Sequence, residues 1–310
     1  MAQGIVNRLV PNSALALGVV RVVVHGTFLV SVFVTSFSSL GELPATLLRP
    51  VGVMKLVPWG VYDALLTPRN MTLLKLIMLL SLLLSTTGYL TSLTTKLSLV
   101  LVVFYQGLVR SFGHFNHDEM LGIYYLGILA FTPCGDGFSL DSWSSRKSAN
   151  KSGFAYGYPI LLMQLLMAWV YFSSALIKLR VAGLSYLSPD NLPALAIYHS
   201  LDNMHDSSFK LAFWLPAVRR STPFAVGGVL LWELLFPLAV FFKRLRWWIL
   251  GLGVLFHIST LLLMNIFFPH QLAMYLVFVD WDWVAERLGR GRREVKSSHG
   301  NGSVSLPESS

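Results

Sequence analysis

The sequence is poor in cysteine and in charge. Its 310 residues include one cysteine, Cys134, which excludes an internal disulfide and any zinc site built from a cysteine pair. Only 13% of the residues are charged, against roughly 25% in soluble proteins. The chain contains no Walker loop, dinucleotide fingerprint, HExxH motif or GxSxG motif. These absences argue against a soluble enzyme of the common classes.

Apolar residues dominate what is present. They make up 54% of the chain, enough for at most about eight spans of roughly 20 residues each. Eight apolar runs occur, at residues 13–38, 71–91, 96–112, 119–133, 158–179, 222–242, 246–268 and 270–284. The pattern predicts an all-α, polytopic transmembrane bundle of about eight helices. The fourth and last runs are short, so the bundle includes tilted, partly buried or re-entrant segments.

The remaining segments are read from their composition. Residues 41–70 contain four prolines and an apolar cluster around Trp59, which predicts a piece lying on the membrane surface. Residues 185–221 are polar enough for a large external loop. The basic, then Ser- and Gly-rich end of the chain predicts disorder. The expected organisation is a transmembrane domain over 1–284 and a disordered tail over 285–310.

The net charge of +9 is interpreted as a topology signal, because no basic stretch interleaved with aromatic residues lies outside the apolar runs. No nucleic-acid partner is therefore expected, and the lipid bilayer is the expected environment. With eight spans both termini share one side, and the basic tail gives that side its excess of Lys and Arg. We therefore expect a multi-pass integral membrane protein with cytoplasmic N- and C-termini.

Ionisable residues inside apolar runs are costly and usually face the interior of a bundle. Six such residues occur: Arg21, His25, Arg110, Lys178, Glu233 and His257. Arg110 and Lys178 lie near span ends, where long side chains also extend to the interface. Arg21 has a structural alternative as well, an ion pair with Glu233 that holds two helices together.

His117 and Lys178 form the strongest candidate site. His117 precedes the short fourth helix, where it could also be only a neighbour of a helix cap at Asn116 or Asp118. Tracing eight spans places the start of the fourth and the end of the fifth on the same, extracytoplasmic side. His117 and Lys178 can therefore approach each other there. Burial of a lysine in apolar surroundings favours its neutral form, which is a base.

Two further possibilities carry less weight. Cys134 lies in a turn-rich loop, but no histidine is close in sequence and nothing predicts a reactive thiol. The histidines show no metal-ligand spacing beyond the weak pair His114 and His117, so no metal is expected.

Three stretches carry a resemblance to a known family. They are FNHDEMLGIYYLGILAFTPCGDGFSLD, YPILLMQLLMAWVYFSSALIKLRVAGLSYL and WELLFPLAVFFKRLRWWILGLGVLFHISTLLLMNIFF. Their ordered elements are Asn-His before a short helix, Ser-x-Asp ending at Asp141, Tyr-Phe then Lys-Leu, an acid, and Phe-His. Together they resemble the HTTM (horizontally transferred transmembrane) family, over most of residues 10–285. Its characterised relative is the vitamin K-dependent gamma-carboxylase.

The resemblance implies a function and its residues. In the carboxylase, a membrane lysine deprotonates reduced vitamin K, and reaction with dioxygen yields an epoxide and a strong base. That base removes a glutamate γ-proton so that carbon dioxide can add. The resemblance places the lysine at Lys178 and the active-site histidine at His117. His257 matches the Phe-His element and is a further candidate catalytic residue. It thus implies reduced vitamin K or another quinol as cofactor, and a small peptide or a lipid as substrate.

Two departures from the carboxylase pattern bear on this implication. Ile177 stands where the carboxylase has a second lysine. The carboxylase also has a large C-terminal region that helps to bind a propeptide, whereas this sequence continues from Trp283 into a basic tail. The expected quinol chemistry is therefore better supported than carboxylation of a clotting-type substrate.

Two other classes of function stay open. The first is a non-catalytic membrane component that assists maturation or export of a secreted peptide, with its buried charges holding helices together. The second is a proton-coupled transporter that uses Glu233, His257 and Arg21. The second is weakened because the chain shows no pair of matching halves.

Overall fold

The computed structural model describes residues 2–113, 119–144, 151–202 and 211–288. These residues form helices and no strand. The α-helices are α1 Ala2–Leu9, α2 Ala14–Val34, α3 Trp59–Leu65, α4 Pro68–Thr87, α5 Thr91–Ser111, α6 Met120–Ala130, α7 Leu140–Ser144, α8 Phe154–Ala182, α9 Asn191–Asp202, α10 Thr222–Leu235, α11 Leu238–Phe241, α12 Lys243–Met264 and α13 Pro269–Met274. Short 3-10 helices are η1 Ser38–Glu42, η2 Ala45–Leu47, η3 Gly52–Leu56, η4 Gly183–Leu187, η5 Leu211–Ser221 and η6 Tyr275–Phe278. Residues 281–288 are also helical.

Five of these helical stretches are long and apolar enough to cross a membrane: Ala14–Val34, Pro68–Thr87, Thr91–Ser111, Phe154–Leu187 and Lys243–Met264. This confirms a polytopic helical bundle and a multi-pass membrane protein. The other predicted runs are shorter or broken. The run 222–242 is divided into α10 and α11 by Pro237, which cannot donate a helical hydrogen bond. The run 270–284 contains only α13 and η6 before the helical residues at its end.

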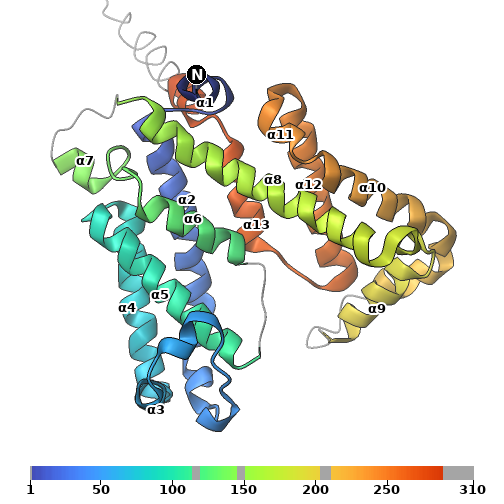
Figure 1. Cartoon of the computed structure of the whole chain (residues 1–310), viewed down its shortest axis with the longest axis horizontal. Helices are drawn as coiled ribbons and strands as arrows, with labels where there is room; N and C mark the ends of the chain where they lie inside the picture. The colour runs from blue at the N-terminus through green and yellow to red at the C-terminus, as the bar shows by residue number, and fades with distance from the viewer. Residues whose placement is uncertain (1, 114–118, 145–150, 203–210, 289–310) are drawn as a thin grey trace, which may run out of the picture.

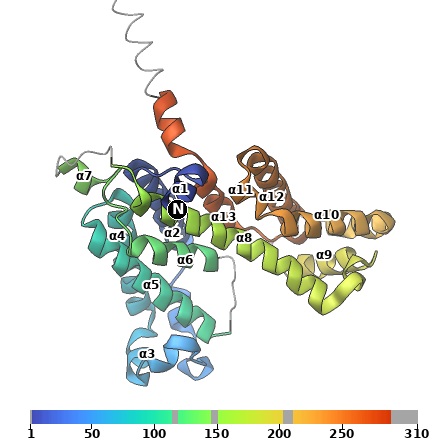
Figure 2. The ribbon, with the colours of Figure 1, turned by 45° about the horizontal axis from the view of Figure 1, so that its top comes forward.

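The helices form two groups joined by α8 (Figure 1). In the first group α2 packs on α4, α4 on α5 and α5 on α6. In the second group α10 packs on α8, α11 and α9 pack on α12, and α9 lies against η5. Figure 2 shows the same division from another side, with α8 running out of the first group to its end beside α9 and α10. The far end of α8 therefore belongs to the second group.

Close packing joins the start of α2 to the loop before α7. A Cβ atom at Gly18 would lie 2.0 Å from the carbonyl oxygen of Gly137, so only glycine fits there. Ser13 and Ser152 form a β-bridge, which brings the beginning of α2 beside the beginning of α8. These two spans therefore start at the same end of the molecule.

The proline-rich segment 41–70 folds into η1, η2, η3 and α3 rather than one helix, as its prolines predict. Met54 is buried and packs at Gly107 of α5, whereas Val53 and Leu56 are 63% and 83% exposed. Such exposed apolar side chains suit a lipid surface. The placement of this segment on the membrane surface stays a prediction.

Candidate functional site

Lys178 and Glu233 form an ion pair between the last turns of α8 and α10. The Lys178 Nζ atom lies 2.6 Å from Glu233 Oε1, and the Ser174 hydroxyl donates to the same oxygen at 3.3 Å. The side chains are 25% and 3% exposed, respectively. The second oxygen, Glu233 Oε2, is buried and has no hydrogen-bond partner among the described residues. The pair therefore has one carboxylate oxygen in use and one available.

The surroundings of this pair differ between its two sides. Tyr186 of η4 covers it, with the ring centroid 5.9 Å from Lys178 Nζ. The chain reaches η4 through Gly183, whose φ of +55° favours glycine. Toward the outside, Ile177, Val181 and Leu184 are 60%, 81% and 80% exposed. Lys178 thus lies between an aromatic cover and an apolar surface that suits lipid.

His257 belongs to a second polar cluster, buried between α8, α12 and η6. The Tyr171 hydroxyl shares hydrogen bonds of 2.8 Å with His257 Nε2 and with the Tyr275 hydroxyl. Gly253 leaves room for this arrangement, because a Cβ atom there would lie 2.2 Å from Tyr275 Oη. Tyr171 precedes Lys178 by two helical turns, about 10 Å along α8. His257 therefore contacts the same face of α8 that carries Lys178, but about two helical turns before the ion pair.

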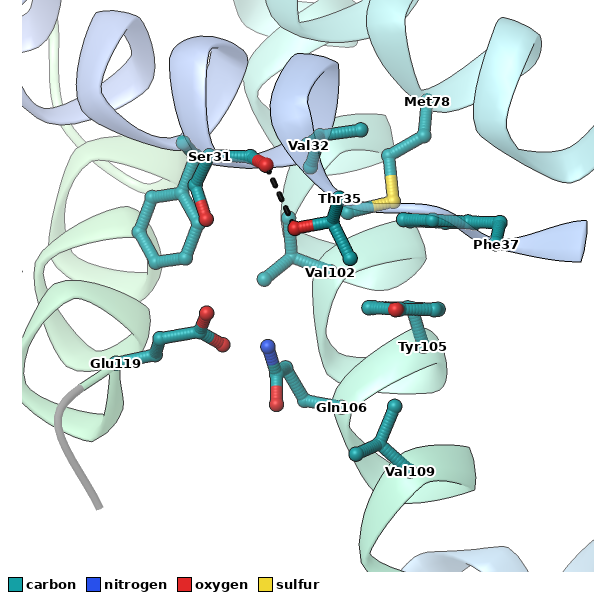
Figure 3. Close-up of a pocket in the computed structure, with 11 residues that line it drawn as sticks. Ser31, Val32, Thr35, Phe37, Met78, Val102, Tyr105, Gln106, Val109 and Glu119 are labelled. Carbon is teal, nitrogen blue, oxygen red and sulfur yellow. Dashed lines mark hydrogen bonds between the residues drawn. The ribbon is translucent and has the colours of Figure 1, made fainter. Parts of the chain in front are cut away.

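His117 lies outside the described residues, and its approach to Lys178 stays a prediction. The start of α6 nearby contributes Glu119 to a cavity of about 240 Å³ between α2, α4 and α5. Figure 3 shows the Glu119 carboxylate and the Gln106 amide pointing toward each other in this cavity. The wall is otherwise largely apolar, and no residue of α8 or α10 lines it. Lys178 and Glu119 therefore do not share this cavity.

The N-terminal end of α6 also differs from expectation. Glu119 is its N-cap residue, and the Glu119 side chain makes no capping hydrogen bond. The expected caps, Asn116 and Asp118, lie outside the described residues. The sequence pattern could not fix this boundary because three acidic or amide side chains compete within four positions.

Arg21 does not pair with Glu233, so that structural alternative is wrong. Its guanidinium is fully buried and donates to the carbonyl oxygens of Cys134 at 2.9 Å, Phe138 at 2.7 Å and Thr86 at 3.3 Å. His25, one turn further on, contacts the Arg21 carbonyl through Nδ1 at 3.1 Å. Arg21 therefore holds the first span against a loop and the end of α4.

Asp141 also has a structural role. Its carboxylate accepts hydrogen bonds from the backbone N–H of Leu90 at 2.9 Å and of Thr91 at 2.7 Å, and from the Thr91 hydroxyl at 2.7 Å. Burial alone would raise the pKa of Asp141, but these bonds to Thr91 and Leu90 lower it below its ordinary value. Asp141 thus caps the start of α5 from the first turn of α7.

Two other predicted residues keep the places that the sequence suggests. Arg110 lies in the last turn of α5, partly buried. Cys134 is buried, and burial raises the pKa of its thiol to about 11. Its Sγ donates to the Leu129 carbonyl at 3.4 Å. The sequence-based rejection of Cys134 as a nucleophile agrees with this environment.

Sequence reasoning gave no role to several participating residues, although one of them, Tyr171, belongs to the Tyr-Phe element. Tyr171, Tyr275 and Ser174 lie within or beside apolar runs, where aromatic and small polar residues usually pack without function. Arg246 begins the predicted run 246–268 and was given no role, but it is buried in the first turn of α12. It donates to the carbonyls of Ala239, Phe278, Leu9 and Val240. The sequence Arg244-Leu245-Arg246 gives no signal that only Arg246 is buried.

Comparisons with known proteins give one match. The model of the HTTM domain matches residues 10–283, most of the chain. The matched range includes every residue of the ion pair and of the Tyr171–His257–Tyr275 cluster. No curated protein and no solved structure matches the sequence.

Proposed function

The chain belongs to the HTTM family, whose domain is the membrane domain of the vitamin K-dependent carboxylase family, and on that premise we propose that it is a quinol-activating membrane enzyme. Lys178 and Glu233 would receive the proton of a reduced quinone, such as reduced vitamin K. The single observation that carries the proposal is the Lys178–Glu233 contact of 2.6 Å beside an unpartnered carboxylate oxygen.

In this proposal Lys178 and Glu233 act as one proton-holding unit. A proton can move between Lys178 Nζ and Glu233 Oε1 along their short contact, and Glu233 Oε2 provides a further acceptor. The Lys178 ammonium then offsets the negative charge left on the oxygen that lost its proton. Such compensation is worth more in apolar surroundings than in water. Ser174 fixes the carboxylate orientation through its hydrogen bond.

The environment of the pair suits a hydrophobic substrate. The exposed side chains of Ile177, Val181 and Leu184 would contact lipid, so a quinone could approach Lys178 without crossing water. When bound, the quinol would supply the acidic hydroxyl and, with dioxygen, the oxidising chemistry. The second half-reaction, modification of a small peptide or a lipid by carboxylation, belongs to the same proposal through the family alone.

His257 and His117 take supporting roles in this proposal. His257 is held by Tyr171, so it could position the side of α8 that carries Lys178 or relay charge through the tyrosine hydroxyls. His117 precedes Glu119 at the start of α6, and its role rests on the family resemblance. We place the site on the extracytoplasmic side, with both termini in the cytoplasm.

The test uses the purified, reconstituted protein with reduced vitamin K and dioxygen, and measures epoxide by chromatography. Lys178→Met should lower the rate by about 100-fold or more, the contribution typical of a general base. Arg180→Met is the matched control, because Arg180 is an exposed cation on the same helix. Arg180→Met should behave as the parent. Absence of epoxide with the parent, or an unchanged rate with Lys178→Met, contradicts the proposal.

One observation favours a second candidate, a non-catalytic membrane component. Arg21 and Arg246 are buried cations that join separate segments through hydrogen bonds to backbone carbonyls. Lys178 and Glu233 could join α8 to α10 in the same way. Under this alternative the parent would form no epoxide, and Lys178→Met would lose a co-purifying partner.

A further inference from the structure

A second surface of the molecule lies outside the candidate site. It is the exposed side of η5 at the entry to α10, which we call the η5 surface: Phe213, Trp214, Val218, Arg219 and Arg220. Phe213, Trp214 and Val218 are 51%, 72% and 54% exposed, and both arginines are exposed as well. In the yellow-to-orange part of Figure 1 this segment lies where α9 and α10 meet, at the far end of the second helix group.

The charge of the η5 surface is positive and largely uncompensated. Arg219 Nη1 lies 3.3 Å from Asp190 Oδ1, but the two side chains are 59% and 72% exposed. Exposed pairs of this kind contribute little and exchange readily with other partners. Arg220 makes no ion pair with any described residue. Two guanidinium groups therefore face one carboxylate.

The combination of side chains indicates what covers this surface. Large apolar side chains followed by two arginines are typical of segments at the lipid headgroup level, where rings insert and cations remain near phosphate. The apolar surface also continues into α10, where Phe224 is 84% exposed. Water alone would leave these side chains unfavourably exposed. A bilayer would bury the apolar side chains in its interior and would pair the arginines with its phosphate groups.

We propose that the η5 surface binds anionic phospholipid headgroups. Arg219 and Arg220 contact the phosphates, and Phe213 and Trp214 insert beside them. Asp190 is the internal competitor for Arg219, so anionic lipid replaces a weak exposed ion pair. This proposal goes beyond the quinol activity and does not depend on it.

The η5 surface is also linked to the cover of the candidate site. The Thr222 hydroxyl donates to the Pro189 carbonyl at 2.8 Å, and Arg219 contacts Asp190. Pro189 and Asp190 follow η4 after one intervening residue, Ser188. The η4 helix carries Tyr186, which lies over Lys178. Lipid bound at Arg219 would therefore be connected, through Asp190 and the residues that precede it, to the segment that carries Tyr186 over the ion pair.

The experiment measures lipid retention by the full-length protein. The protein is purified in detergent, mixed with equal amounts of phosphatidylglycerol and phosphatidylcholine, and analysed by native mass spectrometry. We expect the parent to retain phosphatidylglycerol preferentially. Arg219→Gln with Arg220→Gln should lower that preference by about fivefold or more, since each basic residue near an anionic surface contributes roughly fivefold.

Two further variants keep the result interpretable. Arg8→Gln with Arg69→Gln removes the same charge from exposed positions elsewhere and should keep the preference. Asp190→Asn removes the competitor of Arg219 and should raise the preference, a gain that misfolding would not produce. An unchanged preference in the Arg219 and Arg220 variant overturns the proposal. So does conversion of a dimer to a monomer by that variant, which would assign the surface to a second copy of the chain.

Discussion

The ion pair between Lys178 and Glu233 can be tested by a double-mutant cycle. At 2.6 Å, two unit charges attract by about 6 kcal/mol for an effective dielectric constant near 20. Desolvation of the carboxylate, which is 3% exposed, offsets much of this attraction. Glu233→Gln leaves the ammonium without its partner, but Lys178 is 25% exposed and regains some water. We therefore expect a loss of about 2–3 kcal/mol, below the usual 3–5 kcal/mol for a fully buried pair.

The cycle compares Glu233→Gln, Lys178→Met and the two changes together. We expect Lys178→Met to cost a similar amount, because it leaves the buried carboxylate alone. The double variant should be more stable than the sum of the single losses predicts, by about 2 kcal/mol. The assay is thermal unfolding in detergent, where each lost kcal/mol lowers the melting temperature by roughly 1–2 °C in a chain of 310 residues. Strictly additive losses would refute the inferred contact.

Three more predictions concern the surrounding structure. Cys134 should react slowly with a maleimide in the folded protein, because a pKa of about 11 leaves about 1 in 1,000 thiols ionised near pH 8. Rapid labelling of the folded protein would contradict the burial of this thiol. Asp141 has a lowered folded pKa, so it contributes stability that is present above about pH 4, the ordinary pKa of the group, and is lost as the pH falls below that value through the lowered folded pKa. The melting temperature of Asp141→Asn should depend less on pH in this acidic range, and an identical pH profile would count against the cap. Gly18→Ala should lower the free energy of unfolding by about 1–3 kcal/mol or more, and with it the melting temperature, because the new Cβ would collide with the Gly137 carbonyl. Gly4→Ala is the control, since open space surrounds Gly4.

The sequence predicts the class of the fold well because apolar composition and run length act locally. The same runs do not show where proline divides a helix into two packed pieces, as Pro237 does between α10 and α11. Whether a run becomes a full span also depends on its neighbours. Thus α6 is apolar, yet it spans only Met120–Ala130 and packs against α5, α2, α8 and α13.

For the candidate site, sequence reasoning selected the ionisable groups but not their partners. Lys178, Glu233 and Arg21 were all identified as buried charges, and an Arg21–Glu233 pair was as consistent with the sequence as the observed Lys178–Glu233 pair. The choice depends on which helices are neighbours, a property of tertiary packing that no local pattern encodes. Tyr171 belongs to the Tyr-Phe element but received no role, because a buried hydroxyl becomes informative only when its partner, His257, is known.

The length of α8 determines how deep the ion pair lies in a bilayer. The helix extends about 44 Å, longer than a hydrocarbon core of about 30 Å. Its start is joined to the start of α2, and we expect these two helix starts to lie at one membrane boundary. Lys178 follows about 36 Å further along the axis, so at tilts up to about 40° it stands close to the opposite boundary. Under the proposed function, a molecule with a long apolar tail would stay dissolved in lipid while its reacting group meets Lys178 and Glu233 near the membrane surface.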